Sequence, residues 1–531
     1  MSTDLDTIAK DSVRGSFFLV SGNILATVIQ AVGVFVVARL LGPGLYGIYT
    51  LSLVVPTLLL QVIDFGVNQG LIRFSATLRV KGETGQVAAL VRNAFLFKLI
   101  IGLIISGFTI LFSDYFATYA VNRPDISMYI RIASLAVLFH AILDTSTSVF
   151  IGIDNAEYCT LAWNVQASAK TALAILLVFL GFSVFGAVTG YVVGALIAGI
   201  LSAAILYSKI YKSLNPGIET DNSFKKSLKF LIGYGYPIYI SALFFSLIPQ
   251  VQSIILSIFV SDADIGNFRA ASNFVALISI LILPISTALF PAFSKFDKES
   301  EEIRKFFSLS TMYATLLVVP AVTVTVIFSK EFVDVIYGSQ WTLAPAFLSL
   351  NVLLYLFVGL GYQIQTSFFN GIDETFTTLK IGLTTFLLFI LLSPFLTMYF
   401  SVQGMILATL VSSLLATTYG TYIAKTKFKV KLYYKKLLLI YSAAAVSAVP
   451  PLLIQKVIHT SSIIEIIIAG LVYLLSYITL LPLLHVMTKQ EIKNVEHVAE
   501  RIPLVKPLIM ILMRYQYEIA ARLEQEPKDT T

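Results

Sequence analysis

Four ionisable residues lie inside long apolar stretches of the sequence. Asp64, His140, Asp144 and Lys170 stand among Leu, Ile, Val and Phe residues, and His140 and Asp144 are spaced to share one face of a helix. Charged groups in such surroundings are costly, and they mostly face a polar cavity, a partner charge or a transported ion. We therefore expect the two aspartates and His140 to form a site for H⁺ or Na⁺. Lys170 would serve as their counter-ion or as a contact for a phosphate group.

Uncharged polar residues at helical spacing extend these faces. Gln61 and Asn68 flank the first aspartate, and Gln250 lies in a stripe of serines further along the chain. The alternative is a structural role, because polar side chains also join membrane helices through hydrogen bonds worth about 1 kcal/mol or less each. A neutral His140 that is hydrogen-bonded to Asp144 would likewise be a core residue. Both roles remain open for these side chains.

The elements that must position these residues are membrane-spanning helices. The 531 residues are 57% hydrophobic and 13% charged, and the mean hydropathy is +0.85. A bilayer core needs about 20 apolar residues per helix, and continuous apolar runs argue against a β-barrel. We therefore predict an all-α membrane protein with fourteen spans. They lie near 16–41, 45–71, 93–113, 128–152, 160–181, 185–208, 230–260, 266–293, 304–329, 343–369, 376–400, 402–424, 434–457 and 462–487.

The positions of Lys and Arg predict the orientation. If the N-terminus is cytoplasmic, 28 of the 37 basic residues fall in cytoplasmic segments, 5 in outer loops and 4 within or at the edges of spans. We therefore expect a multi-pass protein of the cell membrane with both termini in the cytoplasm. This topology and contact with anionic lipid headgroups account for the net charge of +7, so we expect no nucleic-acid partner.

One phrase occurs twice in the chain. The stretches STSVFIGID (146–154) and QTSFFNGID (365–373) share six of nine residues at an offset of 219, and the same offset relates the turns at 44–52 and 263–271. We interpret spans 1–6 and 7–12 as parallel repeats about an axis along the membrane normal. In each copy we expect the glycine to close a turn and the aspartate to start the next helix.

The repeat also predicts the domain organisation. We expect two six-helix lobes, then two additional transmembrane helices and an interfacial tail. The ranges are 1–208 for the N-terminal lobe, 209–229 for a cytoplasmic linker, 230–424 for the C-terminal lobe, 425–487 for the added helices and 488–531 for the tail.

The two lobes differ in their charges. At the offset of 219, Asp144 corresponds to Gln363 and His140 to Gly359, so the second copy keeps a polar position and loses the charge. We therefore assign titratable chemistry to the first lobe, with Gln250 and Gln363 as polar contributors from the second. Arg14 and Arg269 lie nearer the ends of spans, where we expect them to contact phosphates or lipid headgroups.

The sequence offers little support for catalysis or for a resident cofactor. Its four histidines show no metal-ligand spacing, and the single Cys159 excludes an internal disulfide and a cysteine metal cluster. The GPGLYG stretch (42–47) satisfies a dinucleotide-binding pattern but follows no strand, and there is no P-loop. We expect no catalytic residues, no metal and no cofactor, and therefore no enzyme.

Two quoted stretches carry a family resemblance. ARLLGPGLYGIYTLSL (38–53) and DFGVNQGLIRFSA (64–76), with the F-x-G-I-D phrase and the two extra spans, resemble polysaccharide and O-antigen lipid flippases. These form a branch of the multidrug/oligosaccharidyl-lipid/polysaccharide exporter superfamily. The resemblance covers essentially the whole chain. It implies a transporter that moves a polyprenyl-(pyro)phosphate-linked oligosaccharide to the outer leaflet by alternating access, with a functional link to glycosyltransferases.

The charges within the spans depart from that expectation, because the clearest ones are acidic while the cargo would be anionic. Two other functions therefore remain alternatives. A cation-coupled efflux antiporter of small amphipathic molecules would share the twelve-span core but lack the two extra spans. A membrane glycosyltransferase or polysaccharide polymerase would need a sizeable outer loop or soluble domain, and the sequence predicts neither.

Overall fold

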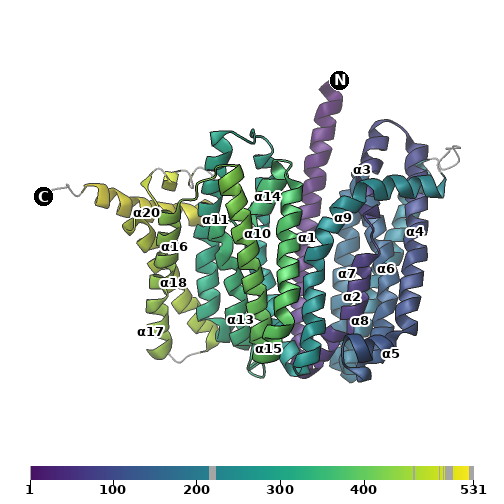
Figure 1. Ribbon diagram of the computed structural model, residues 1–531, viewed down its shortest axis with the longest axis horizontal. Coiled ribbons are helices and arrows are strands. Elements are labelled where there is room, and N and C mark those ends of the chain that lie inside the picture. Colours follow the sequence, from purple (N-terminus) through teal and green to yellow (C-terminus); the bar gives the residue numbers. More distant parts are fainter. Residues whose placement is uncertain are drawn as a thin grey trace. The chain divides into compact units, whose positions relative to one another are not determined.

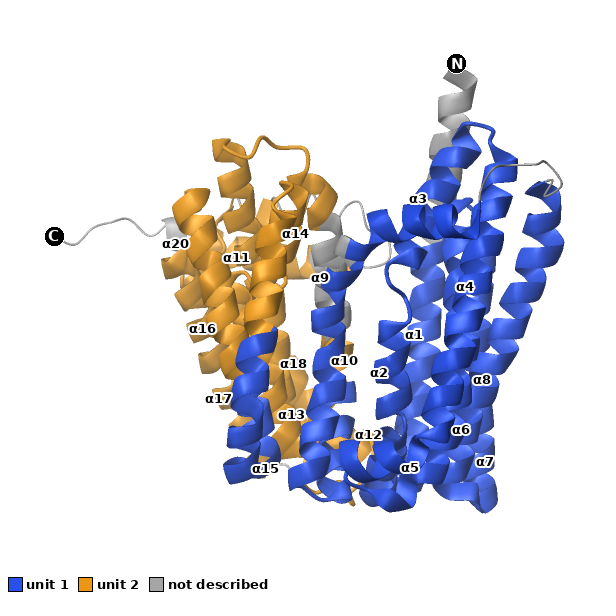
Figure 2. Cartoon of the chain, turned by 45° about the vertical axis from the view of Figure 1, so that its right-hand side comes forward, with its two compact units in different colours: residues 1–273, 386–408 blue, residues 274–385, 409–531 orange. Residues whose placement is uncertain are grey.

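The computed structural model describes residues 2–214, 223–457, 461–489, 491–493, 496 and 506–525, and it is helical with no strand in these ranges (Figure 1). Within them the side chains of residues 2–17, 237–238, 241 and 279–288 are among those outside the description. The chain forms two compact units. Unit 1 contains residues 1–273 and 386–408, and unit 2 contains residues 274–385 and 409–531 (Figure 2).

Unit 1 is built from the first nine helices and the start of the tenth. They are α1 (Ser2–Ser52), α2 (Val54–Val62), α3 (Val67–Val80), α4 (Thr84–Leu111), α5 (Ser113–Tyr115), α6 (Ser127–Gly152), α7 (Ala156–Leu177), α8 (Ser183–Ile205), α9 (Phe224–Phe259) and α10 (Asp262–Phe293). Short π and 3₁₀ turns join them. These are η1 (Phe116–Ala120), η2 (Pro124–Ile126), η3 (Val178–Phe182), η4 (Leu206–Ile210) and η5 (Tyr211–Leu214).

Unit 2 contains the remaining described helices. They are α11 (Glu301–Ile327), α12 (Ser329–Ile336), α13 (Ala344–Val352), η6 (Leu353–Leu360), α14 (Ile364–Gly371), α16 (Tyr434–Ser447), α17 (Val449–Val457), α18 (Ser462–Leu483) and α20 (Lys506–Gln525). Helix α15 (Thr375–Lys427) contributes to both units. In the tail, α20 packs on α18, where the amide of Gln516 donates to the carbonyl of Ile478 at 3.1 Å. The predicted lobe boundaries remain a prediction.

The helices have the lengths and composition of membrane spans. Within the described residues, ten helical segments are long and apolar enough to cross a bilayer, and three of them have 45, 59 and 53 residues. At about 1.5 Å per residue these three are roughly two to three times as long as a hydrocarbon core of about 30 Å is thick. Each is interrupted, by a positive φ at Gly42, Gly181 and Ser401 respectively. The all-α membrane fold is confirmed, and the count of fourteen spans remains a prediction.

Two predicted spans are not continuous helices. The span predicted at 45–71 is unwound between α2 and α3, where Phe65 and Gly66 have φ of 49° and 81°. The span predicted at 343–369 passes through the 3₁₀ turn η6 and then unwinds at Gly361 and Gln363, with φ of 91° and 69°. The continuous-helix prediction is wrong here, because a hydropathy window reports how apolar a segment is and not its backbone conformation.

The repeated phrase adopts the same conformation twice. Asp154 follows α6 with φ 58°, and Asp373 follows α14 with φ 60°. In each copy the next backbone N–H donates to the carbonyl five residues earlier, from Asn155 to Phe150 at 2.9 Å and from Glu374 to Phe369 at 2.7 Å. The aspartate is therefore the left-handed residue of the turn, and the expectation that the glycine closes it is wrong.

The glycines of the phrase serve helix packing instead. A Cβ added to Gly152 would lie 2.8 Å from the carbonyl oxygen of Ile72 on α3, and one added to Gly371 would lie 2.7 Å from Cβ of Phe293 on α10. Residues 72 and 293 are 221 positions apart, which is close to the repeat offset of 219. Each copy therefore places its helix against an equivalent neighbour.

A reciprocal contact within unit 1 shows the same relation. A Cβ added to Gly47 would lie 1.9 Å from the carbonyl oxygen of Asp262, and one added to Gly266 would lie 1.9 Å from that of Pro43. The pairs 43 and 262, and 47 and 266, each differ by 219. The two corresponding segments, one in α1 and one at the start of α10, thus contact each other reciprocally, and their backbones approach closely because neither glycine has a side chain.

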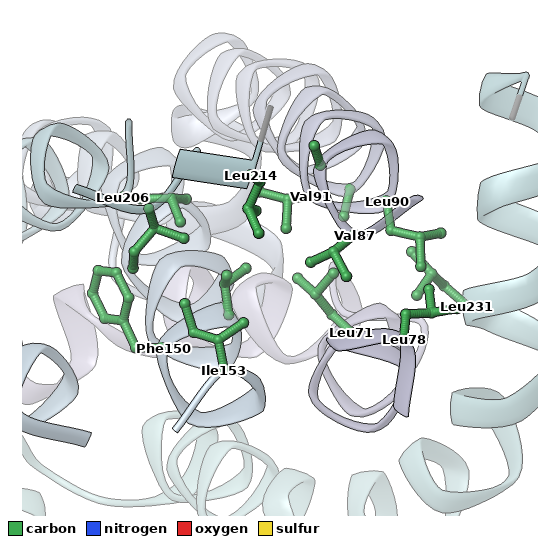
Figure 3. Close-up of a cluster of buried hydrophobic side chains, with 14 of the residues drawn as sticks. Leu71, Leu78, Val87, Leu90, Val91, Phe150, Ile153, Leu206, Leu214 and Leu231 are labelled. Atoms are coloured by element: carbon green, nitrogen blue, oxygen red, sulfur yellow. The ribbon is translucent and has the colours of Figure 1, made fainter. Parts of the chain in front are cut away.

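A buried apolar cluster joins the helices at one end of unit 1 (Figure 3). It takes Leu71 from α3, Val91 from α4 and Phe150 from α6, and it extends to Leu206 and Leu214 at the end of α8. Burying such side chains stabilises a protein by about 1.5–3 kcal/mol each when water is the reference. In this way α3 and α4 are held against α6, which fixes the helices that line the site below.

We predict that replacing Gly47 or Gly266 by alanine destabilises the protein. The new methyl group would overlap a backbone oxygen, and overpacking of this kind costs about 1–3 kcal/mol. The apparent melting temperature of the purified variants would fall. Gly44→Ala is the control, since its Cβ would meet nothing within 4 Å. An equal fall in melting temperature for Gly44→Ala would contradict the close-contact role.

Candidate functional site

Unit 1 encloses a polar cavity of about 280 Å³. Its walls come from α2, the unwound segment after it, α3, α6 and α9. The polar lining residues are Gln61, Asp64, Asn68, Gln69, Asp144, Tyr239 and Ser246, and the apolar ones are Leu60, Ala242 and Leu243. The cavity therefore brings together both predicted aspartates.

The unwound segment supplies part of the cavity wall. Helix α2 stops at Val62, which leaves backbone carbonyl groups without their helical partners. The hydroxyl of Tyr239 on α9 lies 3.1 Å from the carbonyl oxygen of Gln61 and 3.3 Å from that of Val62, and it donates to them. An irregular backbone at membrane depth is tolerated where such groups satisfy it and where it lines a cavity.

Asp64 lies in this segment and is paired with a cation. Its Oδ1 accepts the backbone N–H of Asn68 at 3.3 Å, and it lies 2.5 Å from Nζ of Lys98 on α4. The Lys98 side chain is only 3% exposed, against 23% for Asp64. A buried ammonium group needs a partner of this kind, because its desolvation is otherwise uncompensated. Sequence reasoning missed Lys98 as a site residue, although a lysine in the middle of a span was a usable signal.

Asp144 faces the same cavity from α6. It lies within electrostatic range of both Lys98 and Asp64, and within the described residues its carboxylate belongs to no ion pair. One lysine is thus placed near two carboxylates. The local charge is net negative, which suits an exchangeable cation.

His140 belongs to a different polar cluster. Its Nδ1 lies 2.9 Å from the carbonyl oxygen of Ala136, and its Nε2 lies 2.8 Å from Nε2 of Gln166 on α7. A carbonyl can only accept, so Nδ1 carries the proton and Nε2 accepts from the amide of Gln166. Both nitrogens of a neutral imidazole are satisfied in this arrangement. The alternative of a hydrogen bond between His140 and Asp144 is wrong.

Lys170 shares an aromatic partner with His140. The imidazole stacks on Tyr191 of α8 with ring centroids 5.3 Å apart, and Nζ of Lys170 lies 5.4 Å from the centroid of the same ring. A cation held over an aromatic face is stabilised by the ring quadrupole. The structure therefore places Lys170 and His140 together, while Asp64 pairs with Lys98 and Asp144 faces the same cavity as Asp64.

The other predicted residues lie outside the cavity lining. Gln250 is one turn from Ser246 on α9 and donates to its carbonyl at 3.5 Å. Arg269 on α10 donates to the carbonyl of Pro249 at 2.7 Å and to Oγ of Ser253. Its guanidinium thus joins α10 to α9, and its contact with headgroups remains a prediction. Arg14 lies in α1, but its side chain falls outside the described residues.

Gln363 lies in unit 2, exposed at the break before α14. Its neighbour Gln365 is buried and was missed by sequence reasoning. Nε2 of Gln365 donates to the carbonyl groups of Leu360 and Thr417 at 2.8 and 2.9 Å. This amide satisfies a carbonyl that the broken helix leaves free.

A basic aromatic groove lies between α3 and α9. It has a volume of about 550 Å³, and Lys226, Lys229 and Phe230 are among its lining residues. The guanidinium of Arg73 lies 4.1 Å from the ring centroid of Tyr234. The same two helices also line the polar cavity. We call this pocket the α3–α9 groove.

We predict that Lys98→Met destabilises the protein and that Asp64→Asn in the same chain restores most of the loss. Removing one partner of a buried pair costs about 3 kcal/mol or more, since the other charge is left unpaired, whereas removing both is often close to neutral. Melting temperatures of the purified variants would check this. A double variant no more stable than Lys98→Met would refute the pairing.

Solved structures with a similar fold are membrane transporters. The lipid II flippase MurJ in an inward closed conformation aligns with a TM-score of 0.69 and 15% identity, over 87% of this chain and 98% of that one. An inward-facing multidrug resistance MATE family transporter aligns with a TM-score of 0.61 and 15% identity, over 77% of this chain and 94% of that one. The fold is thus the one shared by these transporters.

Curated relatives are named for glycan export. The probable low-salt glycan biosynthesis flippase Agl15 of Haloferax volcanii is 22% identical over 512 residues, covering 91% of this chain and 98% of the relative. A putative O-antigen transporter of Shigella flexneri is 20% identical, covering 66% and 81%. The sequence model of the family described as polysaccharide biosynthesis protein matches residues 12–297, more than half of the chain. This protein therefore belongs to the polysaccharide biosynthesis protein family.

Proposed function

We propose that this protein flips a polyprenyl-(pyro)phosphate-linked oligosaccharide from the cytoplasmic to the outer leaflet of the cell membrane, for the assembly of a surface glycan. The observation that carries the proposal is the polar cavity with its buried ion pair inside an apolar helical protein of this family. A glycan headgroup cannot cross the hydrocarbon core without such a polar path. The names of the relatives Agl15 and O-antigen transporter support this cargo class.

The size of the cavity supports alternating access. A volume of about 280 Å³ lies below the usual range for ligand sites, about 300–1,000 Å³, so an oligosaccharide requires a wider state. We propose that the lobes 1–208 and 230–424 rock about the fixed site, with the termini and the linker 209–229 in the cytoplasm. The glycosyltransferases that build the lipid-linked glycan would supply the substrate.

The closed contact at the predicted outer side supports this cycle. Nε of Arg123 lies 2.7 Å from Oδ1 of Asp262, and its other nitrogens donate to the carbonyl groups of Ser257 and Val260, each at 2.9 Å. The guanidinium therefore ties the segment after η1 to the turn between α9 and α10. Opening toward the outside would have to break these three interactions.

We propose that Asp64 and Asp144 bind the coupling ion, H⁺ or Na⁺. In this conformation Lys98 occupies the carboxylate of Asp64, and an incoming cation at Asp144 would compete for the same negative charge. The ion and the lysine are both cations, so an ion bound near Asp144 would weaken the attraction between Lys98 and the carboxylates and would shift the equilibrium between states. His140 and Lys170 would support the site from α6 and α7.

Neutralising both aspartates should abolish ion-driven transport. We expect Asp64→Asn with Asp144→Asn to lose transport of a labelled lipid-linked glycan in proteoliposomes with an imposed ion gradient. Asp154→Asn is the matched control, because this exposed aspartate lies in a left-handed turn that asparagine tolerates. Full gradient-driven activity in the double variant would disprove coupling at this site.

We propose further that the α3–α9 groove receives the phosphate groups, with Arg14 and Arg269 as additional headgroup contacts. Arg73 and Lys229 supply cations from the two helices that continue into the cavity. Hydrogen bonds between charged partners contribute about 1.5–3 kcal/mol, or about tenfold or more in affinity.

The test is Arg73→Gln with Lys229→Gln in the same proteoliposomes. We expect a rise of about tenfold or more in the half-saturating concentration of the lipid-linked pyrophosphate glycan, with the maximal rate retained. Lys298→Gln with Lys425→Gln removes the same charge from exposed positions and serves as the control. An unchanged half-saturating concentration would rule out the groove as the phosphate contact.

A second candidate is cation-coupled efflux of small amphipathic molecules, favoured by the likeness to the MATE transporter. The two functions separate in one preparation. Transfer of labelled lipid-linked glycan between leaflets supports the flippase, whereas ion-driven accumulation of a cationic dye without glycan transfer supports the efflux pump. A glycosyltransferase or polymerase is disfavoured, because the relatives are named as flippases and transporters.

A further inference from the structure

A second cleft lies in unit 1, away from the polar cavity. It has a volume of about 140 Å³, and its walls come from α4 and from the end of α8 with the turns η4 and η5. Its lining includes Val91, Arg92, Phe95, Ala203, Tyr207 and Tyr211. We call it the α4–α8 cleft.

The floor of the α4–α8 cleft is fixed by the apolar core. Val91 and Leu206 belong to the buried cluster, and Phe95 and Tyr211 pack against it (Figure 3). The slot is therefore apolar and backed by the buried side chains of the cluster. An apolar slot of this volume suits a short run of methylene groups, and it offers no polar partners for a sugar or a peptide backbone.

The rim of the cleft is aromatic and basic. Tyr207 and Tyr211 stack across the π-helical turn η4 with ring centroids 6.1 Å apart, and Tyr207 is 58% exposed. Nζ of Lys212 lies 5.2 Å from the centroid of the Tyr207 ring, and the side chain of Arg92 is exposed on the opposite wall. The stretches 84–95 and 203–214 contain no acidic residue. The charged side chains of these two stretches are therefore all basic.

The position of the cleft indicates the occupant. The positive-inside distribution places the start of α4 and the end of α8 at the cytoplasmic face, and tyrosines at the ends of membrane helices lie at headgroup level. Basic residues there attract the anionic lipids of the inner leaflet. We propose that the α4–α8 cleft binds one anionic membrane lipid, with an acyl or isoprenoid chain in the slot and the headgroup phosphate between Arg92 and Lys212.

This site is distinct from the path of the transported glycan. Its walls are α4 and the end of α8, whereas the polar cavity and the α3–α9 groove are lined from α2, α3, α6 and α9. A bound lipid would join α4 to the end of α8 at the level of the membrane surface. We therefore expect it to stabilise unit 1 without entering the transport cycle as cargo.

The test uses the full-length protein in neutral detergent. Dioleoyl phosphatidylglycerol, dioleoyl phosphatidylcholine and inorganic phosphate are added separately, and lipid retention is measured by native mass spectrometry alongside the melting temperature. We expect retention of phosphatidylglycerol over phosphatidylcholine, and a loss of about 5-fold in affinity for each cation removed, since one basic residue near an anionic lipid surface contributes about 1 kcal/mol.

Three variants separate the headgroup from the chain. Arg92→Gln with Lys212→Gln should abolish the preference for phosphatidylglycerol, and Arg92→Lys with Lys212→Arg should retain it. Ala203→Trp should block the slot while keeping both charges, with Ala203→Leu as the smaller change if the first variant is not monodisperse. Lys298→Gln with Lys425→Gln is the control for charge and should bind as the parent does.

The proposal is overturned by any of three results. The first is retention of phosphatidylcholine equal to that of phosphatidylglycerol. The second is undiminished binding of phosphatidylglycerol, either in the variant with Arg92→Gln and Lys212→Gln or in both Ala203 variants. The third is stabilisation by inorganic phosphate equal to that by phosphatidylglycerol. The last result would identify a surface that binds phosphate without a chain. Because glycan transport is not measured, the outcome is independent of the proposed function.

Discussion

The ion pair between Asp64 and Lys98 is the interaction on which the rest of the site depends. The desolvation of either charge alone inside a membrane protein would be strongly unfavourable, so α4 must hold Lys98 where the chain unwinds after α2. The unwinding in turn exposes carbonyl groups that only a neighbouring donor can satisfy, and Tyr239 of α9 provides it. The ion pair, the break and the packing of α9 are thus parts of one arrangement, and the polar cavity is its result.

Charge is divided between two places in unit 1. The cavity is lined by two carboxylates, one of them paired with the buried Lys98, while Lys226 and Lys229 line the α3–α9 groove. Under the proposed function this division would let an anionic cargo bind beside an acidic interior, because the phosphate would contact the groove and the sugars would occupy the cavity. Under the proposed function the acidic interior would serve as a cation site, and Lys98 would link binding of the ion to the conformation of the helix break.

The duplicated phrase marks equivalent packing in the two halves. The aspartates of both copies have a left-handed backbone conformation, and the glycine of each copy lies close to a neighbouring helix. Gly47 and Gly266, which are related by the same offset, make a reciprocal backbone contact. The halves then diverge where chemistry is concerned. Asp144 lies in an unbroken α6, whereas its counterpart Gln363 lies in the break before α14, and Gln365 has become the buried amide that satisfies that break.

The sequence alone determined that this protein lies in a membrane, that it is helical, and which of its residues carry a high free-energy cost of burial. Hydropathy is summed over a segment, so it indicates that 45–71 and 343–369 are apolar enough to span a membrane. The free-energy cost of placing a charge in the membrane identifies Asp64, Asp144 and Lys170 as unusual. Only the tertiary structure decided which charge meets which. Lys98 and Asp64 are 34 residues apart and sit on different elements. Their pairing, the neutral His140 bound to Gln166 and the unwound segment arise from contacts between helices, because those contacts compensate costs that no local pattern records.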